Sequence, residues 1–241
     1  MRPKKSGKEC IWIDAENGFD PEFATKCGLD VDNLVLSQSS IGEETINLMA
    51  KLLEAQPDII VLDSVASVIP LTDLNEPMEQ ATMATRARLM SRGLAKLNTL
   101  NKKTLIMLIN QIRVNIGAYG NPIQSTGGKA IGHYSSIRVE VRRGQVLTQN
   151  KKDVGQEVKF KIKKSKVSRP FQQGIFNFMY DTCSIDGVNE LLSIALLENK
   201  IKRTGAYYEI AGGKFQGREK LEEEMRKNPE FYQAVKKELN L

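Results

Sequence analysis

The sequence predicts an α/β protein with a mostly parallel central sheet, followed by a small α/β domain at its C-terminal end. Short apolar runs alternate with segments of helical periodicity, which is the pattern of βαβ units. Two of these runs, within residues 58–64 and 104–111, end in polar side chains. Because ligands bind at the carboxyl ends of strands in open parallel sheets, these polar ends predict a ligand site.

The expected elements follow one another along the chain in βαβ order. Pro21 after Asp20 marks the start of the first helix, and Gly28 marks its end. Ser40 and Glu43 have the spacing of a capping box for the second helix. Strands are predicted over residues 10–13, 34–37, 58–65 and 105–109, and helices over residues 21–26, 42–54 and 80–100.

Residues 105–109 (LIMLI) form a continuous apolar run, which predicts a strand covered on both faces of the sheet. Asn110 and Gln111 then stand at its carboxyl end. Beyond them, polar residues separate the glycines at positions 117, 120, 127 and 128. This composition predicts a loop that becomes ordered on a partner.

The C-terminal half contains a strand signal of a different kind. Residues 158–166 (VKFKIKKSK) alternate between apolar and basic side chains, which predicts a strand with one buried and one basic face. After a further strand near residues 175–180, the polar segment 181–187 predicts a boundary between domains 1–184 and 185–241. The last helix is expected to start at the Asn228–Pro229 cap.

Composition limits the class of protein. With 241 residues, of which 41% are hydrophobic, the chain can form one sizeable core and a small appendage. The net charge of +6 suits a polyanionic partner. The three cysteines contain no C-x-x-C pair, which indicates a reducing compartment and no disulfide or metal framework. Since no apolar run is long enough to span a bilayer, we expect a cytoplasmic protein without a membrane partner.

Several sequence blocks occur in one order from Lys8 to the end of the chain. They are IWIDAENGFDP (11–21), DIIVLDSVAS (58–67), LINQIR (108–113), GNP with STGG (120–128) and SKVSRPF (165–171). Order and approximate spacing resemble those of the bacterial RecA recombinases. The resemblance implies a RecA-type P-loop ATPase core that uses ATP and Mg²⁺. It also implies ATP-dependent homologous strand exchange in DNA recombination, repair and the SOS response to DNA damage, with single-stranded DNA, duplex DNA and like protomers of a helical filament as partners.

The same resemblance implies the catalytic residues. Glu16 matches the carboxylate that orients the attacking water, and Gln111 matches the glutamine that senses the γ-phosphate. Lys164 and Lys166 match a pair that reaches the nucleotide of the neighbouring protomer. From the residues alone, a solvated turn is the favoured interpretation of Glu16, and the alternative for the lysines is a solvated face or a charged edge strand.

Nucleotide-binding residues follow in the same way. Asp63 and Ser64 match the end of the Walker B strand, where the aspartate holds Mg²⁺ through water. From the residues alone, Asp63 is equally consistent with a cap on the following turn. Asp20 and Phe23 fall where the family contacts adenine, although Phe23 also fits a core aromatic side chain.

Two segments, 76–84 and 115–128, resemble the DNA-binding loops of the family. His133 stands where the family usually has phenylalanine, and we interpret it as a packing substitution at an interface. Four basic residues, Lys200, Lys202, Arg203 and Lys214, form a candidate patch for duplex DNA, with solubility as the alternative. The candidate residues for single-stranded DNA are Met83, Arg88, Arg113, Ile116, Gly127, Gly128 and Lys129.

No G-x-x-x-x-G-K-[ST] motif occurs in the 241 residues. Ser6-Gly7-Lys8 is followed by Glu9 and a strand, whereas a phosphate loop needs Ser or Thr and then a helix. By resemblance, the chain starts before the second core strand, and the family's oligomerisation helix, first strand and P-loop are expected to be missing. Autonomous ATPase activity is therefore predicted to be lost. The alternative function is a non-catalytic DNA-binding or filament-modulating RecA paralogue or fragment.

Overall fold

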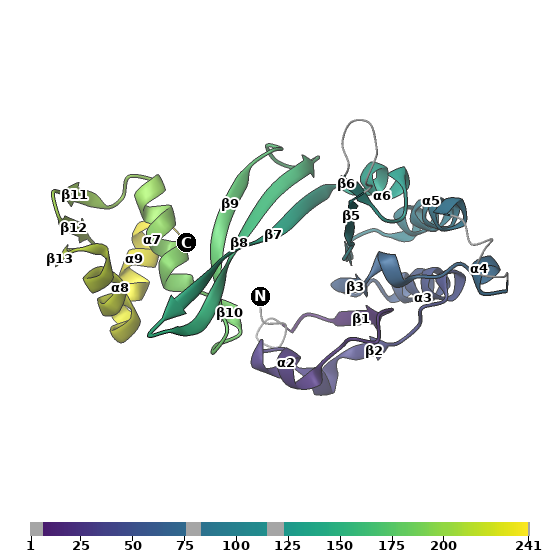
Figure 1. The fold of residues 1–241 in the computed structure, drawn as a ribbon, viewed down its shortest axis with the longest axis horizontal. Helices are drawn as coiled ribbons and strands as arrows, with labels where there is room; N and C mark the ends of the chain where they lie inside the picture. The colour runs from purple at the N-terminus through teal and green to yellow at the C-terminus, as the bar shows by residue number, and fades with distance from the viewer. Residues whose placement is uncertain (1–6, 76–82, 115–122, 241) are drawn as a thin grey trace. The chain divides into compact units, whose positions relative to one another are not determined.

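The structure is a computed structural model that describes residues 7–75, 83–114 and 123–240 (Figure 1). The chain divides into two compact units, Met1–Arg138 and Val139–Leu241. We refer to them as the first and second units and describe each by itself.

The first unit contains the predicted parallel sheet. Its strands pair in the order β2-β1-β3-β4, and all three pairings are parallel. Ile13 is in register with Leu62, which is in register with Leu108, so one face of the sheet carries a continuous apolar row. The strands are β1 (Cys10–Asp14), β2 (Val35–Ser37), β3 (Ile59–Asp63) and β4 (Leu105–Leu108).

Two helices cover that face of the sheet. Apolar side chains of α3 and α5 pack against Ile13, Ile60 and Leu62 in one core, which contains Met49 and Leu97 among its fully buried members. The helices of this unit are α2 (Pro21–Lys26), α3 (Gly42–Ala55), α4 (Leu71–Asn75), α5 (Met83–Leu100) and α6 (Lys129–Tyr134), with 3-10 turns η1 (Val31–Asn33) and η2 (Val65–Ser67). A separate antiparallel pair is formed by β5 (Ile112–Val114) and β6 (Ile123–Ser125).

The prediction that the 105–109 strand is covered on both faces was wrong. Ile106 and Leu108 pack against the core, but Leu105 and Met107 are 54% and 47% exposed. Side chains alternate between the two faces of a strand, and β4 is the last strand of the four-stranded sheet in the described residues. A continuous apolar run therefore did not indicate burial on both faces.

The structure confirms the N-cap predicted for α2 and contradicts the capping box predicted for α3. Asp20 is the N-cap of α2, and its carboxylate accepts from the amides of Glu22 and Phe23. The capping box was wrong, because the N-cap of α3 is Ile41 and no side chain caps it. Glu43 Oε2 instead accepts from the amide of Leu71 at 2.8 Å, which joins the start of α3 to the start of α4.

The second unit begins with an antiparallel sheet in the order β10-β9-β8-β7. The alternation in β8 is confirmed: Val158, Phe160 and Ile162 are half-buried, whereas Lys159, Lys161 and Lys163 are exposed. The strands are β7 (Ile137–Gln149), β8 (Lys152–Ser165), β9 (Gln173–Met179) and β10 (Ser184–Ile185).

A group of C-terminal elements has its own core, centred on Leu192 and Leu221. Asn228 caps the last helix as predicted, since its side chain accepts from the amide of Phe231. The predicted domain boundary at residues 184/185 falls inside the second unit, just before this group, and stays a prediction. The elements are α7 (Gly187–Leu197), β11 (Lys202–Thr204), β12 (Tyr207–Ile210), β13 (Gly213–Gln216), α8 (Arg218–Lys227) and α9 (Pro229–Glu238). No helix in the described ranges is long and apolar enough to cross a bilayer.

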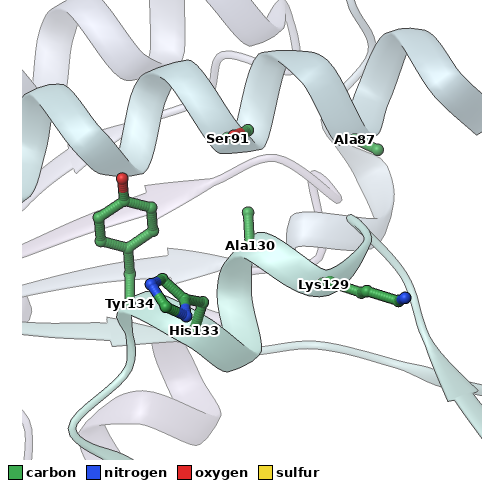
Figure 2. A pocket seen from close by; sticks show the side chains of 6 residues that line it. All are labelled: Ala87, Ser91, Lys129, Ala130, His133 and Tyr134. Atoms are coloured by element: carbon green, nitrogen blue, oxygen red, sulfur yellow. The ribbon is translucent and has the colours of Figure 1, made fainter.

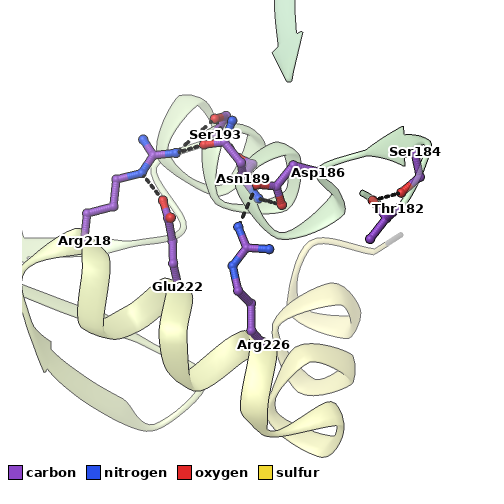
Figure 3. A network of polar contacts seen from close by, with 8 residues as sticks. All are labelled: Thr182, Ser184, Asp186, Asn189, Ser193, Arg218, Glu222 and Arg226. Atoms are coloured by element: carbon purple, nitrogen blue, oxygen red, sulfur yellow. Dashed lines mark hydrogen bonds and ion pairs between the residues drawn. The ribbon is translucent and has the colours of Figure 1, made fainter. Parts of the chain in front are cut away.

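A polar network joins α7 to α8 in this group (Figure 3). Asp186, which is 8% exposed, is the N-cap of α7 and also accepts from Arg226 Nη2 at 2.6 Å. Arg218 bridges Glu222 and Asn189. Arg226 is therefore the cation that neutralises the nearly buried Asp186 carboxylate. The Glu190 carboxyl lies near the same site, and its pKa is raised by burial and by the charge of Asp186.

Replacing Arg226 with alanine is expected to lower the free energy of unfolding by about 2 kcal/mol, because it leaves the Asp186 carboxylate without its charged donor. Lys227→Ala is the matched control, since the neighbouring Lys227–Glu223 pair is exposed and is expected to contribute nothing measurable. Urea denaturation followed by circular dichroism measures both. Equal effects of the two substitutions would contradict the prediction.

Candidate functional site

A polar cluster lies at the carboxyl ends of β1, β3 and β4, and Glu16 is at its centre. Gln111 Nε2 donates to Glu16 Oε1 at 2.8 Å, and Ser67 Oγ donates to the same oxygen at 3.2 Å. The hydroxyl of Ser64, which is 1% exposed, also donates to it. Three side chains, all distant from Glu16 in the sequence, therefore hold its carboxylate in place.

Backbone contacts explain why these residues meet. The amides of Ala15 and Glu16 both donate to the carbonyl of Asp63, at 2.7 and 3.2 Å, so the segment after β1 folds over the end of β3. The amide of Val65 donates to the carbonyl of Ile109 at 2.9 Å, which joins the ends of β3 and β4. The Asp63–Ser64 peptide bond is cis.

Asp14 and Ser67 belong to the cluster, although we assigned neither a role from the sequence. The carboxylate of Asp14 is 2% exposed and accepts from the amides of Gly18 and Phe19 at 3.1 and 2.9 Å. It thereby shapes the turn that carries Glu16. An aspartate three residues before Asn17-Gly18 was the available signal, because Asp side chains often bond to backbone amides a few residues on. Ser67 had no comparable signal.

The carboxylates at this end of the sheet affect one another. Burial raises the pKa of the Asp63 carboxyl, and the charges of Glu16 and Asp14 raise it further. A cation near Asp63 would offset both effects. Mg²⁺ typically keeps several waters and binds one or two carboxylates together with phosphate oxygens, which this donor set fits. In the described part of the chain, no group of three His, Cys, Asp or Glu residues could hold a metal.

Asp63→Asn is expected to raise the melting temperature at pH 7 without Mg²⁺. A carboxyl whose pKa is raised by folding favours the folded state only when protonated, so its ionised form destabilises the protein as the pH rises through the raised pKa. The difference between variant and wild type should disappear below about pH 4, where the carboxyl is protonated in both states. Melting curves from pH 3.5 to 8 measure this. Glu54→Gln on α3 is the control, and a lower melting temperature for Asp63→Asn at pH 7 would contradict the prediction.

The residues predicted to contact adenine lie at the start of α2. Asp20 uses one carboxylate oxygen, Oδ1, to cap the helix. The ring of Phe23 is 49% exposed, so the alternative of a core aromatic side chain was wrong. Contact with a base stays a prediction for both residues.

The predicted lysine pair lies in the second unit. Lys164 is in β8, and Lys166 is exposed just after the end of that strand. The Glu16 cluster belongs to the first unit, so the role of this pair stays a prediction.

Some of the predicted DNA-binding residues are gathered at the start of α6. Gly127 and Gly128 have positive φ angles of 88° and 74°, and Lys129 is the exposed first residue of the helix (Figure 2). Arg88 is exposed on α5. Ile116 and residues 76–82 of the first predicted loop (76–84) lie outside the described residues, as do the side chains of Met83 and Arg113.

Asn110 connects the cluster to this segment. Its side-chain amide donates to the carbonyl of Thr126 at 2.8 Å, and its Oδ1 accepts from the amide of Gln111 at 2.9 Å. Gln111 in turn contacts Glu16. The residues at the tip of β4 therefore touch both the carboxylate cluster and the residue before Gly127.

Three of the four residues of the candidate patch for duplex DNA lie on the C-terminal three-stranded sheet, and Lys200 precedes it. Lys202 and Arg203 are exposed on β11, and Arg203 lies over the ring of Tyr208. Lys214 on β13 is paired with Glu209 at 2.7 Å, which reduces the net charge of the patch. Its role stays a prediction.

A parallel sheet with acidic, amide and hydroxyl side chains at its carboxyl edge defines an α/β protein with a ligand site in the position usual for that class. The sequence profile of the RecA N-terminal domain matches residues 1–185. Over 241 residues and 98% of the chain, the sequence is 37% identical to Protein RecA of Mesoplasma florum and 38% identical to that of Haemophilus ducreyi. The chain covers 72% and 64% of the lengths of these two relatives. The chain therefore belongs to the RecA family.

Proposed function

We propose that this chain is a RecA-type recombinase that binds single-stranded DNA and takes part in ATP-dependent homologous strand exchange during recombination and repair. Family membership supports the general activity. The observation that carries the proposal is the set of contacts around β4, in which Gln111 holds Glu16 and Asn110 holds Thr126. These contacts offer a physical route by which a change at the nucleotide alters the DNA-binding segment.

In this proposal, each residue of the cluster has a separate role. Glu16 accepts a proton from the attacking water, with Oε2 as the assigned atom, because Oε1 is already held by three donors. Asp63 holds Mg²⁺ through water, and Gln111 responds to the γ-phosphate. Bound ATP and Mg²⁺ would supply the phosphoryl group and the charge that neutralises it. Asp14 positions the turn that carries Glu16.

We further propose that the 241-residue chain does not hydrolyse ATP by itself. The sequence contains no G-x-x-x-x-G-K-[ST] motif, whose backbone amides and lysine supply most of the phosphate contacts in P-loop proteins. Hydrolysis above background that is lost in Glu16→Gln would overturn this part of the proposal.

Fluorescence anisotropy of a labelled oligo-dT, with and without ATP and Mg²⁺ and at two salt concentrations, tests the proposed function. We expect binding that weakens with salt, and strengthening of this binding by ATP and Mg²⁺ would support the recombinase function. Gln111→Ala should remove the ATP effect while leaving binding without ATP unchanged. Salt-sensitive binding that is indifferent to ATP would favour the filament-modulating alternative, and absence of binding would refute both functions.

A further inference from the structure

Asn17 and Gly18 form the single Asn-Gly pair of the sequence, and they follow Glu16 directly in the turn after β1. Both residues are exposed, and Asn17 has a left-handed φ of 56°. Asparagine is one of the few residues besides glycine that adopt this conformation readily, which explains its place in the turn. It is also among the chemically least durable side chains in proteins.

An asparagine that precedes glycine can lose its side-chain amide without an enzyme, because glycine has no Cβ atom to hinder the attack. The backbone nitrogen of Gly18 loses its proton and attacks Cγ of Asn17, which expels ammonia and closes a cyclic succinimide. Water then opens the ring. Opening at Cγ gives aspartate, and opening at the main-chain carbonyl gives isoaspartate. In both cases one water is consumed, one ammonia is released and a negative charge is gained.

The carboxylate of Asp14 opposes the first step of this reaction. It is 2% exposed, and its Oδ1 accepts at 3.1 Å from the amide of Gly18, whose nitrogen must lose the proton. A carboxylate in this place stabilises the amide with its proton and disfavours the amide anion. Oδ2 accepts from the next amide, that of Phe19, at 2.9 Å. The Asn-Gly pair is therefore accessible to water but restrained at the attacking atom.

We propose that Asn17 is a site of spontaneous deamidation and that Asp14 sets its rate by holding the amide of Gly18. The reaction needs water alone as the co-reactant. This inference goes beyond the proposed function, because it concerns the covalent state of the chain and not a ligand. Only its consequence for Glu16 as a base rests on that function.

The two products are expected to affect the turn differently. Aspartate tolerates a positive φ as asparagine does, so this product mainly adds a negative charge to the cluster. Isoaspartate lengthens the main chain by one carbon directly after residue 17, which displaces the following amides from Asp14. The ring centroids of Phe19 and Trp12 are 5.7 Å apart, and Trp12 is the single tryptophan. Formation of isoaspartate should therefore change the fluorescence of Trp12.

Peptide mass spectrometry of protein stored at pH 8 tests the site. Cleavage after Lys8 and Lys26 releases residues 9–26, in which Asn17 is the single side-chain amide, so a deamidated form of this peptide identifies the position. Asn150 is the internal control, because it is also exposed and has a φ of 51° but precedes Lys151. We expect Asn17 to be modified several times faster than Asn150. Equal rates at the two positions would overturn the proposal.

Gly18→Ala tests the chemical route without a change of fold. The added Cβ would meet no atom within 4 Å, and Gly18 is not among the glycines with positive φ. We therefore expect an unchanged melting temperature and deamidation at Asn17 that is several times slower. An unchanged rate would contradict attack by the nitrogen of residue 18.

Asp14→Asn tests the restraint. Loss of the charged acceptor should speed deamidation at Asn17 about tenfold, the factor that corresponds to roughly one charge-assisted hydrogen bond. The rate at Asn150 should stay unchanged. Wild-type protein in urea lacks the Asp14 contact without any substitution, so it should show a similar increase at Asn17 even if the variant does not fold. Equal rates at Asn17 for folded and urea-unfolded wild type would overturn the role of Asp14.

The outcomes separate this inference from the proposed function, because none of the measurements uses DNA or ATP. If Asn17 is modified and the Trp12 emission changes in proportion to the isoaspartate fraction, the inference is supported even for a chain that does not bind oligo-dT. If the peptide 9–26 stays intact in protein that binds oligo-dT, the inference is wrong and the proposed DNA binding stands. Isoaspartate without a change of the Trp12 emission would contradict the displacement of the turn.

Discussion

Replacing Leu62 with alanine is expected to lower the free energy of unfolding by about 3 kcal/mol, because it leaves a cavity in the core of the first unit. Leu62 lies in β3, between β1 and β4, and is 1% exposed. Trp12 is the single tryptophan and is in the neighbouring strand β1, so its fluorescence during urea denaturation reports the unfolding of this unit.

Leu105→Ala is the matched control for this experiment. Leu105 occupies the adjacent strand β4 but is 54% exposed, so its truncation removes little buried apolar surface and should cost less than about 1 kcal/mol. A cost as large as that of Leu62→Ala would contradict the exposure of the outer face of β4. It would instead support the prediction, made from the sequence, of a strand covered on both faces.

Gly127→Ala is expected to cost about 3 kcal/mol, from two sources. The φ of +88° is unfavourable for any residue with a Cβ atom, which costs roughly 1–2 kcal/mol. The new Cβ would also lie 2.5 Å from Cδ1 of Ile131 and 3.1 Å from Cγ1 of Val65, and overpacking costs about 1–3 kcal/mol. Because the Ile131 side chain of α6 must shift to relieve this contact, oligo-dT binding should weaken as well. The same Trp12 fluorescence measures the change in stability.

Gly93→Ala separates the two sources. Its Cβ would lie 2.9 Å from side-chain atoms of Ile46, but Gly93 is inside helix α5, where φ is negative and alanine is favoured by about 1 kcal/mol. We therefore expect a much smaller loss of stability than for Gly127→Ala. Similar losses for the two variants would show that crowding alone, without backbone strain, accounts for the effect at Gly127.

The elements of the first unit were largely predictable from local patterns. Helix α2 begins and ends where the Asp20–Pro21 cap and Gly28 indicated, since capping depends on neighbouring residues only. The capping box predicted for α3 is absent, because the Glu43 carboxylate accepts from the amide of Leu71, 28 positions away. The exposure of Leu105 and Met107 was also missed, because the place of a strand in its sheet depends on which strands pair, not on its own composition.

At the candidate site, too, the sequence predicted residue types, whereas the contacts between these residues became clear only from the structure. Residue types at strand ends, with the resemblance to the RecA family, singled out Glu16, Asp63 and Gln111 from the sequence alone. That Asp14 shapes the turn carrying Glu16, and that Asn110 joins β4 to Thr126, became clear only from the structure.

By itself, the sequence determined the α/β class, the alternating main strands and helices up to residue 109 and the residues available for chemistry, because these depend on periodicity, caps and residue type. Only the tertiary structure decided which of these residues touch. The three donors to Glu16 are separated from it by 48, 51 and 95 positions, and contacts over such distances arise from strand pairing and packing. The packing of α6 against α5, where Gly128 lies beside Ala87, has the same origin.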